Sequence, residues 1–185
     1  MLRGRPVKTE IREKIASIIA KMGTSYGYEI YKAYLKAFGK ISLRNLYYNL
    51  KKGLDTGEFI LADVKSEVGD YTWGGQVRHV YYALGPYCKL HKLTDRMKLR
   101  LSDFKEKDFE INWDKEVENQ LNKLKEKRDY FFANKAALKY EDKFKIKKDL
   151  KKKGELLKDW IRNRFSRDKA HEIRVQIDKI CDLEK

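Results

Sequence analysis

The stretch from Ser25 to Leu84 of this 185-residue chain reads SYGYEIYKAYLKAF (25–38), GKI (39–41), SLRNLYYNLKKGL (42–54), GEFILADVK (57–65), SEVGDYTWGG (66–75) and QVRHVYYAL (76–84). Two amphipathic helical segments separated by a glycine turn are followed by two β-runs separated by a glycine-rich loop. This order is typical of a winged helix-turn-helix, whose second helix enters the major groove of DNA while the β-wing reaches the neighbouring groove. We therefore predict an α+β fold, with this unit spanning residues 9–88.

Apolar residues at intervals of three and four predict three helices in this unit. The first follows a cap at Thr9, and the second runs from a cap at Thr24 or Ser25 to Gly39. Ser42 is expected to cap the third helix. The side of the third helix that is expected to be buried carries Leu43, Leu46, Tyr47, Leu50 and Leu54.

The opposite side of the third helix gathers Arg44, Asn45, Tyr48, Lys51 and Lys52. Residues 30–54 contain no acidic residue, whereas a merely solvated helix usually mixes acids with bases. We therefore predict that this face contacts DNA, with the lysines and the tyrosine on phosphates. Arginine and asparagine pair with guanine and adenine edges, so Arg44 and Asn45 are candidate base readers, although a purely phosphate contact stays open. Ser42 completes this predicted DNA-binding set.

The β part predicts a hairpin with an exposed loop. Residues 59–64 and 77–84 are expected to be its strands, with glycines between them that allow a tight excursion. Lys65 and Arg78 lie where the strands enter and leave the loop, so we expect them to straddle a phosphate backbone. Two loop aromatics are expected to pack at the base of the wing, with contact to DNA sugars as the alternative: Tyr71 and Trp73.

Four pieces of this stretch, in order, resemble the PadR-type winged-helix transcriptional regulators over about residues 11–84. These pieces are Gly27-Tyr28-Glu29-Ile30, Leu46-Tyr47-x-x-Leu50, Gly57 with Phe59-Ile60, and Arg78-x-x-Tyr81-x-x-Leu84. The chain departs from the pattern at Gly53, where the family usually has leucine, and in its long wing loop. The resemblance implies a dimeric DNA-binding repressor or activator and leaves the effector and the operator open.

A short basic motif precedes the first helix, within a predicted arm of residues 1–8. Arg3-Gly4-Arg5-Pro6 has the core of an AT-hook, in which glycine lets the backbone approach a narrow minor groove and the arginines follow its negative potential. We predict that Arg3 and Arg5 contact the minor groove. An unstructured arm that makes no such contact is the alternative.

Residues 89–185 carry no strand signal and predict an all-α region of long helices. We expect these helices mainly to form a homodimer, because a single winged helix covers only one half-site of a two-fold operator. A bundle within one chain is the alternative. The residues predicted to form the dimer interface are Leu90, Leu93, Met97, Leu101 and Phe104. The lysine-rich run at 139–153 is interpreted as a solvated helix face, with an additional nucleic-acid contact as the alternative.

Charge and hydropathy restrict the class of protein. The chain has 43 Lys+Arg against 28 Asp+Glu and a formal net charge of +15, which favours a polyanionic partner. It shows no apolar run long enough to span a membrane and no signal-peptide pattern. We therefore expect a cytoplasmic, nucleoid-associated protein.

The sequence shows no disulfide, metal-binding or catalytic motif. Cys88 and Cys181 match neither a disulfide framework nor a zinc knuckle, and no catalytic constellation or phosphate-binding glycine motif appears. We therefore expect no metal, no cofactor and no enzymatic activity. The preferred function is a homodimeric transcriptional regulator, with repression favoured, that binds double-stranded DNA. An architectural nucleoid-type protein of low sequence specificity is the alternative, and a small-molecule effector stays open.

Overall fold

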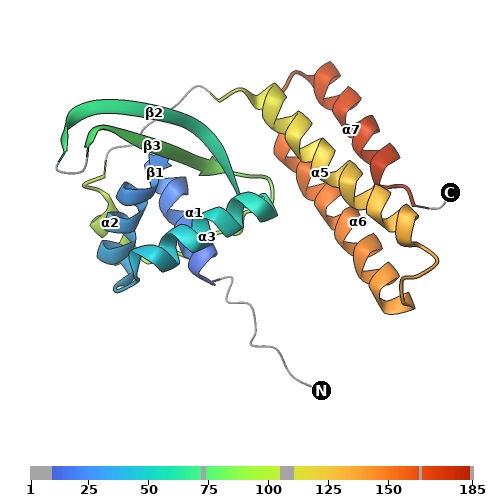
Figure 1. Cartoon of the computed structure of the whole chain (residues 1–185), viewed down its shortest axis with the longest axis horizontal. Helices are drawn as coiled ribbons and strands as arrows, with labels where there is room; N and C mark the ends of the chain where they lie inside the picture. Colours follow the sequence, from blue (N-terminus) through green and yellow to red (C-terminus); the bar gives the residue numbers. More distant parts are fainter. Residues whose placement is uncertain (1–9, 72–73, 105–110, 163, 184–185) are drawn as a thin grey trace. The chain divides into compact units, whose positions relative to one another are not determined.

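The structure, a computed structural model, describes residues 10–71, 74–104, 111–162 and 164–183, with the backbone alone described in 66–71 and 74–78. The chain divides into two compact units, the first ending at Ile111 and the second beginning at Asn112 (Figure 1). The sequence predicted this boundary after residue 88, so the first unit is longer than expected.

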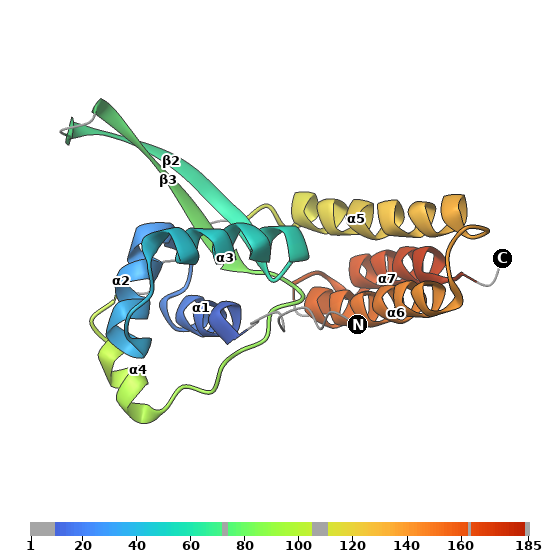
Figure 2. The same cartoon turned by 60° about the horizontal axis from the view of Figure 1, so that its bottom comes forward.

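Within its described residues, the first unit contains helices α1 (Glu10–Met22), α2 (Gly27–Phe38), α3 (Leu43–Thr56) and α4 (Asp95–Leu101), and strands β1 (Ser25–Tyr26), β2 (Phe59–Tyr71) and β3 (Gly74–Leu84). The strand order is β1-β3-β2, and both pairings are antiparallel. Figure 2 shows β2 and β3 as a hairpin that extends away from the helices of this unit. The α+β class expected from the sequence is therefore confirmed.

The start of α2 differs from the prediction. Neither Thr24 nor Ser25 caps this helix; its cap is Tyr26, which makes no side-chain cap hydrogen bond. The reason is that Ser25 and Tyr26 form β1 and pair with β3, so their backbone groups belong to the sheet. The predicted Thr9 cap of α1 lies outside the described residues.

The hairpin is longer than the predicted one. β2 continues to Tyr71 and β3 begins at Gly74, so most of the segment expected to be a loop is paired as strand. The register pairs Lys65 with His79 and Ser66 with Arg78, so Lys65 and Arg78 lie one register step apart rather than directly opposite each other. Backbone hydrogen bonding sustains strands through polar residues, which hydropathy patterns do not reveal.

The core of the first unit is built by all four helices and the base of the hairpin. Its largest buried side chains are Ile15, Ile18, Met22, Ile30, Leu46, Leu50, Phe59 and Leu101. On α3, Leu43 and Tyr47 are 42% and 41% exposed, whereas Asn49 is only 4% exposed. The predicted buried side of α3 is therefore wrong at Leu43 and Tyr47, because the helix is turned by roughly 60° about its axis from the expected position.

Gly53 accounts for this rotation. A Cβ atom at Gly53 would lie 2.1 Å from Cδ2 of Phe59, so the Phe59 ring occupies the space that a side chain would need. Phe59 is 1% exposed and begins β2, so this contact holds the end of α3 against the sheet. The glycine at position 53 is therefore the site of a close helix–strand contact.

The segment that precedes α4 is bound to α1. The His91 N–H donates to the Glu13 carbonyl at 3.2 Å, and the Ser17 hydroxyl donates to the His91 carbonyl at 2.8 Å. Beyond α4, Asp103 forms an ion pair with Lys36 of α2, and the hydrogen bond from Lys36 lowers the pKa of the Asp103 carboxyl. These contacts explain why the first unit continues past residue 88.

The predicted dimer-interface residues find partners within their own chain. Leu101 is fully buried in the core of the first unit, and Leu93 and Phe104 pack against that core. Met97 is half-buried, and Leu90 is 58% exposed. The premise that these side chains need a second chain is wrong for Leu93, Leu101 and Phe104, because hydrophobic burial is non-directional and the first unit supplies the apolar surface.

The second unit is a bundle of α5 (Trp113–Asn134), α6 (Tyr140–Arg162) and α7 (Arg167–Cys181) (Figure 1). The residues buried between these helices include Val117, Leu121, Leu124, Phe131, Leu150, Leu157, Ile161, Ile173, Ile177 and Ile180. Their burial shows that these apolar stripes pack within one chain, as in the alternative of an intrachain bundle, and the homodimer stays a prediction. None of the described helices is long and apolar enough to cross a membrane.

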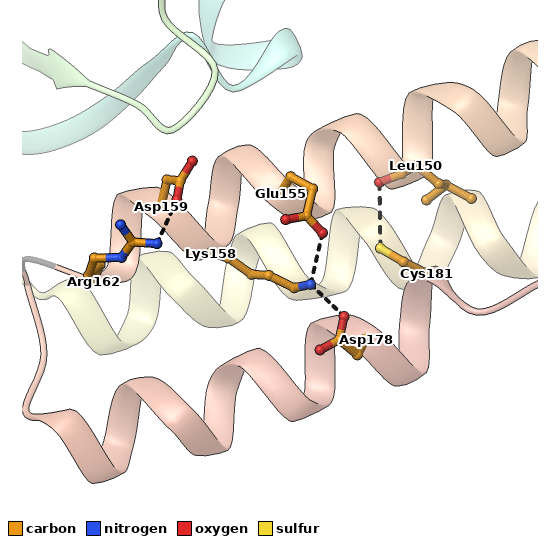
Figure 3. Close-up of polar contacts among 7 residues, drawn as sticks. All are labelled: Leu150, Glu155, Lys158, Asp159, Arg162, Asp178 and Cys181. Carbon is orange, nitrogen blue, oxygen red and sulfur yellow. Dashed lines mark hydrogen bonds and ion pairs between the residues drawn. The ribbon is translucent and has the colours of Figure 1, made fainter.

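Two contacts join α6 to α7. Lys158 lies between Glu155 and Asp178 (Figure 3), and its hydrogen bond to Asp178 raises the pKa of the Lys158 ammonium. At Gly154 a Cβ atom would lie 2.7 Å from Sγ of Cys181, so the absence of a side chain allows α7 to approach. Burial raises the pKa of the Cys181 thiol.

Candidate nucleic-acid interface

Both ends of α3 are fixed by local hydrogen bonds. At its start the Ser42 hydroxyl accepts from the Asn45 N–H at 3.2 Å, which confirms the predicted cap. At its end Gly57 has a φ of 74°, in the left-handed region, and its N–H donates to the carbonyls of Gly53 and Leu54. The side chains of α3 are thus presented from a helix with no frayed end.

The five residues predicted to contact DNA lie together on the exposed side of α3: Arg44, Asn45, Tyr48, Lys51 and Lys52. Tyr48 is 65% exposed, the largest exposed fraction among the apolar and aromatic residues of this helix. Across the described parts of the chain, Arg44, Lys51 and Lys52 have no ion-pair partner. Three full positive charges therefore face solvent on one helix side.

Asn49 determines how Asn45 is presented. The Asn49 side chain is buried at 4% exposure, and its Nδ2 donates to the Asn45 carbonyl and to Asn45 Oδ1, both at 2.9 Å. A backbone carbonyl only accepts, so this contact identifies the Asn49 atom as nitrogen and the facing Asn45 atom as oxygen. Asn45 consequently has its Nδ2 donor available, with Oδ1 engaged.

Sequence reasoning missed Asn49. A polar residue on the core side of an amphipathic helix is a break in the apolar pattern, and it follows Asn45 by four residues, the spacing at which helix side chains meet. Those two observations together were a signal for an orienting hydrogen bond. The four-residue spacing places Asn49 beside Asn45, and the helix rotation described above is what buries Asn49.

Tyr47 lies between α3 and the start of α2. A Cβ atom at Gly27 would lie 2.7 Å from Cε1 of Tyr47, so the ring covers the first turn of α2. Burial raises the pKa of the Tyr47 phenol. The pKa of the Tyr82 phenol is also raised, mainly by burial and secondly by the nearby Tyr47. Both phenols therefore stay neutral at physiological pH and place no negative charge beside the basic face.

The hairpin carries two of the residues predicted to contact DNA, Lys65 and Arg78. Lys65 is exposed, with its Nζ 3.9 Å from Asp63 Oδ2 and 6.0 Å from the centre of the Tyr81 ring, so part of its charge is offset. Only the backbone of Arg78 is described, opposite Ser66. The side chains of Tyr71 and Trp73 lie outside what the structure describes, as do Arg3 and Arg5 of the arm. The structure thus brings together the five predicted residues of α3, whereas the DNA contacts of the hairpin and the arm stay predictions.

The side chains that could bind a metal are dispersed over the described residues. Among them no group of three or more histidine, cysteine or carboxylate side chains is arranged to hold a metal ion. Cys88 and Cys181 are both half-buried and lie in different units.

The exposed side of α3 is therefore the main candidate site, with Asn49 as its orienting residue. No family model, curated protein or solved structure matches this chain.

Proposed function

We propose that the first unit is a winged helix-turn-helix that binds double-stranded DNA with α3 in the major groove, and that the chain regulates transcription. The observation that carries this proposal is the exposed side of α3, where Arg44, Lys51 and Lys52 have no ion-pair partner in the described chain. Unpaired cations on a helix of this kind suit phosphate and base contacts in a groove about 12 Å wide. The β2–β3 hairpin would serve as the wing.

The orientation of Asn45 favours a sequence-specific regulator over an architectural protein. An architectural protein needs only charge and shape, and gains nothing from fixing an exposed amide. Asn45 Oδ1 already accepts from Asn49, so the free Nδ2 donor suits base acceptors such as guanine O6 and N7 or thymine O4. Bidentate pairing with adenine would use Nδ2 together with the second lone pair of Oδ1.

A homodimer remains part of the proposal as the way to occupy a two-fold operator. Its predicted interface now lacks Leu93, Leu101 and Phe104, which are packed within the chain. The exposed apolar residues near α4 are Leu90 and Leu99, at 58% and 73% exposure. Two such residues are a small surface, so self-association is to be tested separately from DNA binding by sedimentation at micromolar concentration.

The test uses duplexes selected by the full-length chain from a random pool, compared with unselected duplex at matched salt. Arg44→Ala should lose about 1–3 kcal/mol on the selected duplex and little on random duplex, because a base-edge contact is lost. Lys51→Ala should weaken both duplexes alike and reduce the salt slope by about 1. The matched control is Lys92→Ala, which is also exposed but lies outside α3 and should change neither affinity.

Two results would count against this proposal. Equal losses for Arg44→Ala on selected and random duplexes would make Arg44 a phosphate contact and favour the architectural alternative. Unchanged duplex affinity in the Arg44, Lys51 and Lys52 variants would remove α3 as the DNA-binding helix.

A further inference from the structure

The second unit carries a surface that the proposed function does not use, on the side of α6 that faces away from the bundle. Its exposed side chains include Tyr140, Phe144, Lys148, Lys151 and Lys152, together with the carboxylates Glu141, Glu155 and Asp159, of which Glu155 and Asp159 pair with Lys158 and Arg162. At 100° per residue they fall within an arc of about 120°, opposite the buried residues Leu150, Leu157 and Ile161. Tyr140 is 83% exposed and Phe144 is 57% exposed, so the described helices of the bundle leave most of both rings uncovered.

The lysines of α6 fall into two groups. Lys145, Lys153 and Lys158 each pair with a carboxylate, at 3.6 Å from Asp142, 3.9 Å from Asp149 and 2.9 Å from Glu155. Figure 3 shows the last of these, where Lys158 also reaches Asp178 on α7. In contrast, five lysines of α6 have no ion-pair partner in the described residues: Lys148, Lys151 and Lys152 on the outer side, and Lys143 and Lys147 nearer the bundle.

Further aromatic residues lie at the same end of the bundle. Residues 135–139 connect the end of α5 to the start of α6, so the last turn of α5 is close to Tyr140 (Figure 1). Tyr130 on α5 is 55% exposed, and Phe132 is 36% exposed with Lys135 Nζ 5.7 Å from its ring centre. This end of the bundle therefore combines exposed rings with positive charge.

We propose that this α6 face binds single-stranded DNA, with Tyr140 and Phe144 stacking on bases and Lys148, Lys151 and Lys152 contacting phosphates. Exposed rings interleaved with unpaired cations are the combination that binds unpaired nucleic acid, because every base offers a flat face for stacking. In duplex DNA the base faces are already stacked on one another and are closed to these rings. The site lies outside the α3 face and does not rest on the proposed function.

Other occupants fit the face less well. A second copy of this chain docking face to face would bring two sets of unpaired lysines together, which is unfavourable. A helix that binds a membrane surface carries an apolar stripe along its whole outer side. On α6 the exposed rings occupy only the first turns, and lysines follow them. A single strand fits both parts of the face, because its unstacked bases can stack on the rings and its phosphates can contact the lysines.

The test uses the full-length chain and a fluorescein-labelled dT oligonucleotide of about 16 nucleotides, a length matched to single-strand sites. The double variant Tyr140→Ala/Phe144→Ala should lose about 10-fold or more in affinity, with Phe144→Tyr close to wild type. Replacing Lys148, Lys151 and Lys152 by alanine should reduce the salt slope by about 2, since each phosphate contact contributes about 0.7 on single strands. All five side chains are exposed, so thermal unfolding should be unchanged.

The matched controls lie on both units. Lys145→Ala removes a paired lysine from the same helix and should leave dT binding within about twofold. Lys51→Ala/Lys52→Ala should weaken duplex binding but spare dT binding, which separates this site from the α3 face. If the α3 variant abolishes dT binding while the ring variant keeps it, the α6 site is refuted whether or not the proposed function holds.

Three further outcomes would also overturn the proposal. The first is unchanged dT affinity in the ring variant, and the second is an equal loss on duplex and dT, which would indicate charge alone. The third is binding of the wild-type chain to vesicles of phosphatidylserine and phosphatidylcholine without binding to dT, which would make the face a lipid contact. Tighter binding to a matched U oligonucleotide would replace DNA by RNA as the ligand.

Discussion

The two units of this chain arrange similar charges differently. In the first unit, the acid-free interval leaves Arg44, Lys51 and Lys52 without ion-pair partners on one side of α3. In the second unit, α6 interleaves lysines with carboxylates. In the part that the structure describes, five of its lysines have no ion pair: Lys148, Lys151 and Lys152 on the outer side, and Lys143 and Lys147 nearer the bundle. Lysine content alone therefore does not identify a binding surface; the carboxylates that the fold brings to each lysine decide it.

Lys36 illustrates the same point within the first unit. It belongs to the acid-free interval of the sequence, yet Asp103, which follows α4, pairs with it. A charge that looks unpaired along the chain is thus neutralised by a residue far away in sequence. The unpaired state of the α3 cations is a property of the fold and not of the interval alone.

The units also share a buried glycine inside a helix, but the two contacts differ in stiffness. At Gly53 the neighbour is the Phe59 ring, fully buried and unable to move without disturbing the core. At Gly154 the nearest neighbour is the Cys181 sulfur, the end of a short side chain that can rotate, and Cγ2 of the buried Ile177 follows at 3.2 Å. The first contact sets the rotation of α3, whereas the second only sets the spacing of α6 and α7.

The largest effect is expected from Leu101→Ala. Leu101 is fully buried, so its truncation should lower the free energy of unfolding of the first unit by about 2–5 kcal/mol. Leu99→Ala on the same helix is the control, because Leu99 is 73% exposed and its loss should cost about 0.5 kcal/mol or less. Urea denaturation measures both. A stable Leu101→Ala variant that fails only to self-associate would restore Leu101 to a dimer interface.

The next effect compares the two glycines. Gly53→Ala should destabilise the first unit by about 1–3 kcal/mol, because the new methyl group overlaps the Phe59 ring. Gly154→Ala should change stability by less than about 1 kcal/mol, since the gain in helix propensity offsets the small shift of Cys181. Thermal unfolding followed by circular dichroism reports both variants. Equal losses at the two sites would show that the contacts are equally stiff.

The smallest effect is expected from the arm. Arg3→Ala/Arg5→Ala should weaken duplex binding by about 1 kcal/mol or less, and only where the flanking sequence is A·T-rich with a narrow minor groove. Competition between duplexes that share one selected site and differ in their flanks measures this preference. The same loss on G·C-rich flanks would reduce the arm to a general phosphate contact.

The sequence determined the local features of this protein. Apolar spacing located α1, α2 and α3, and Ser42 was recognised as the cap of α3. The exposed set from Arg44 to Lys52 was identified by its position opposite the apolar side. These features follow from interactions within a few residues, such as capping bonds and the helical repeat. They do not require knowledge of what packs against the helix.

Only the tertiary structure decided which partner each apolar side chain finds. Leu101 and the stripes of α5, α6 and α7 needed burial, but the hydrophobic effect has no direction and accepts a surface from the same chain as readily as from another. The rotation of α3 against Phe59 decided that Asn49 is buried beneath Asn45 and that Tyr47 is half exposed. Close packing sets such rotations through contacts between residues that are distant in sequence, and no local pattern contains them.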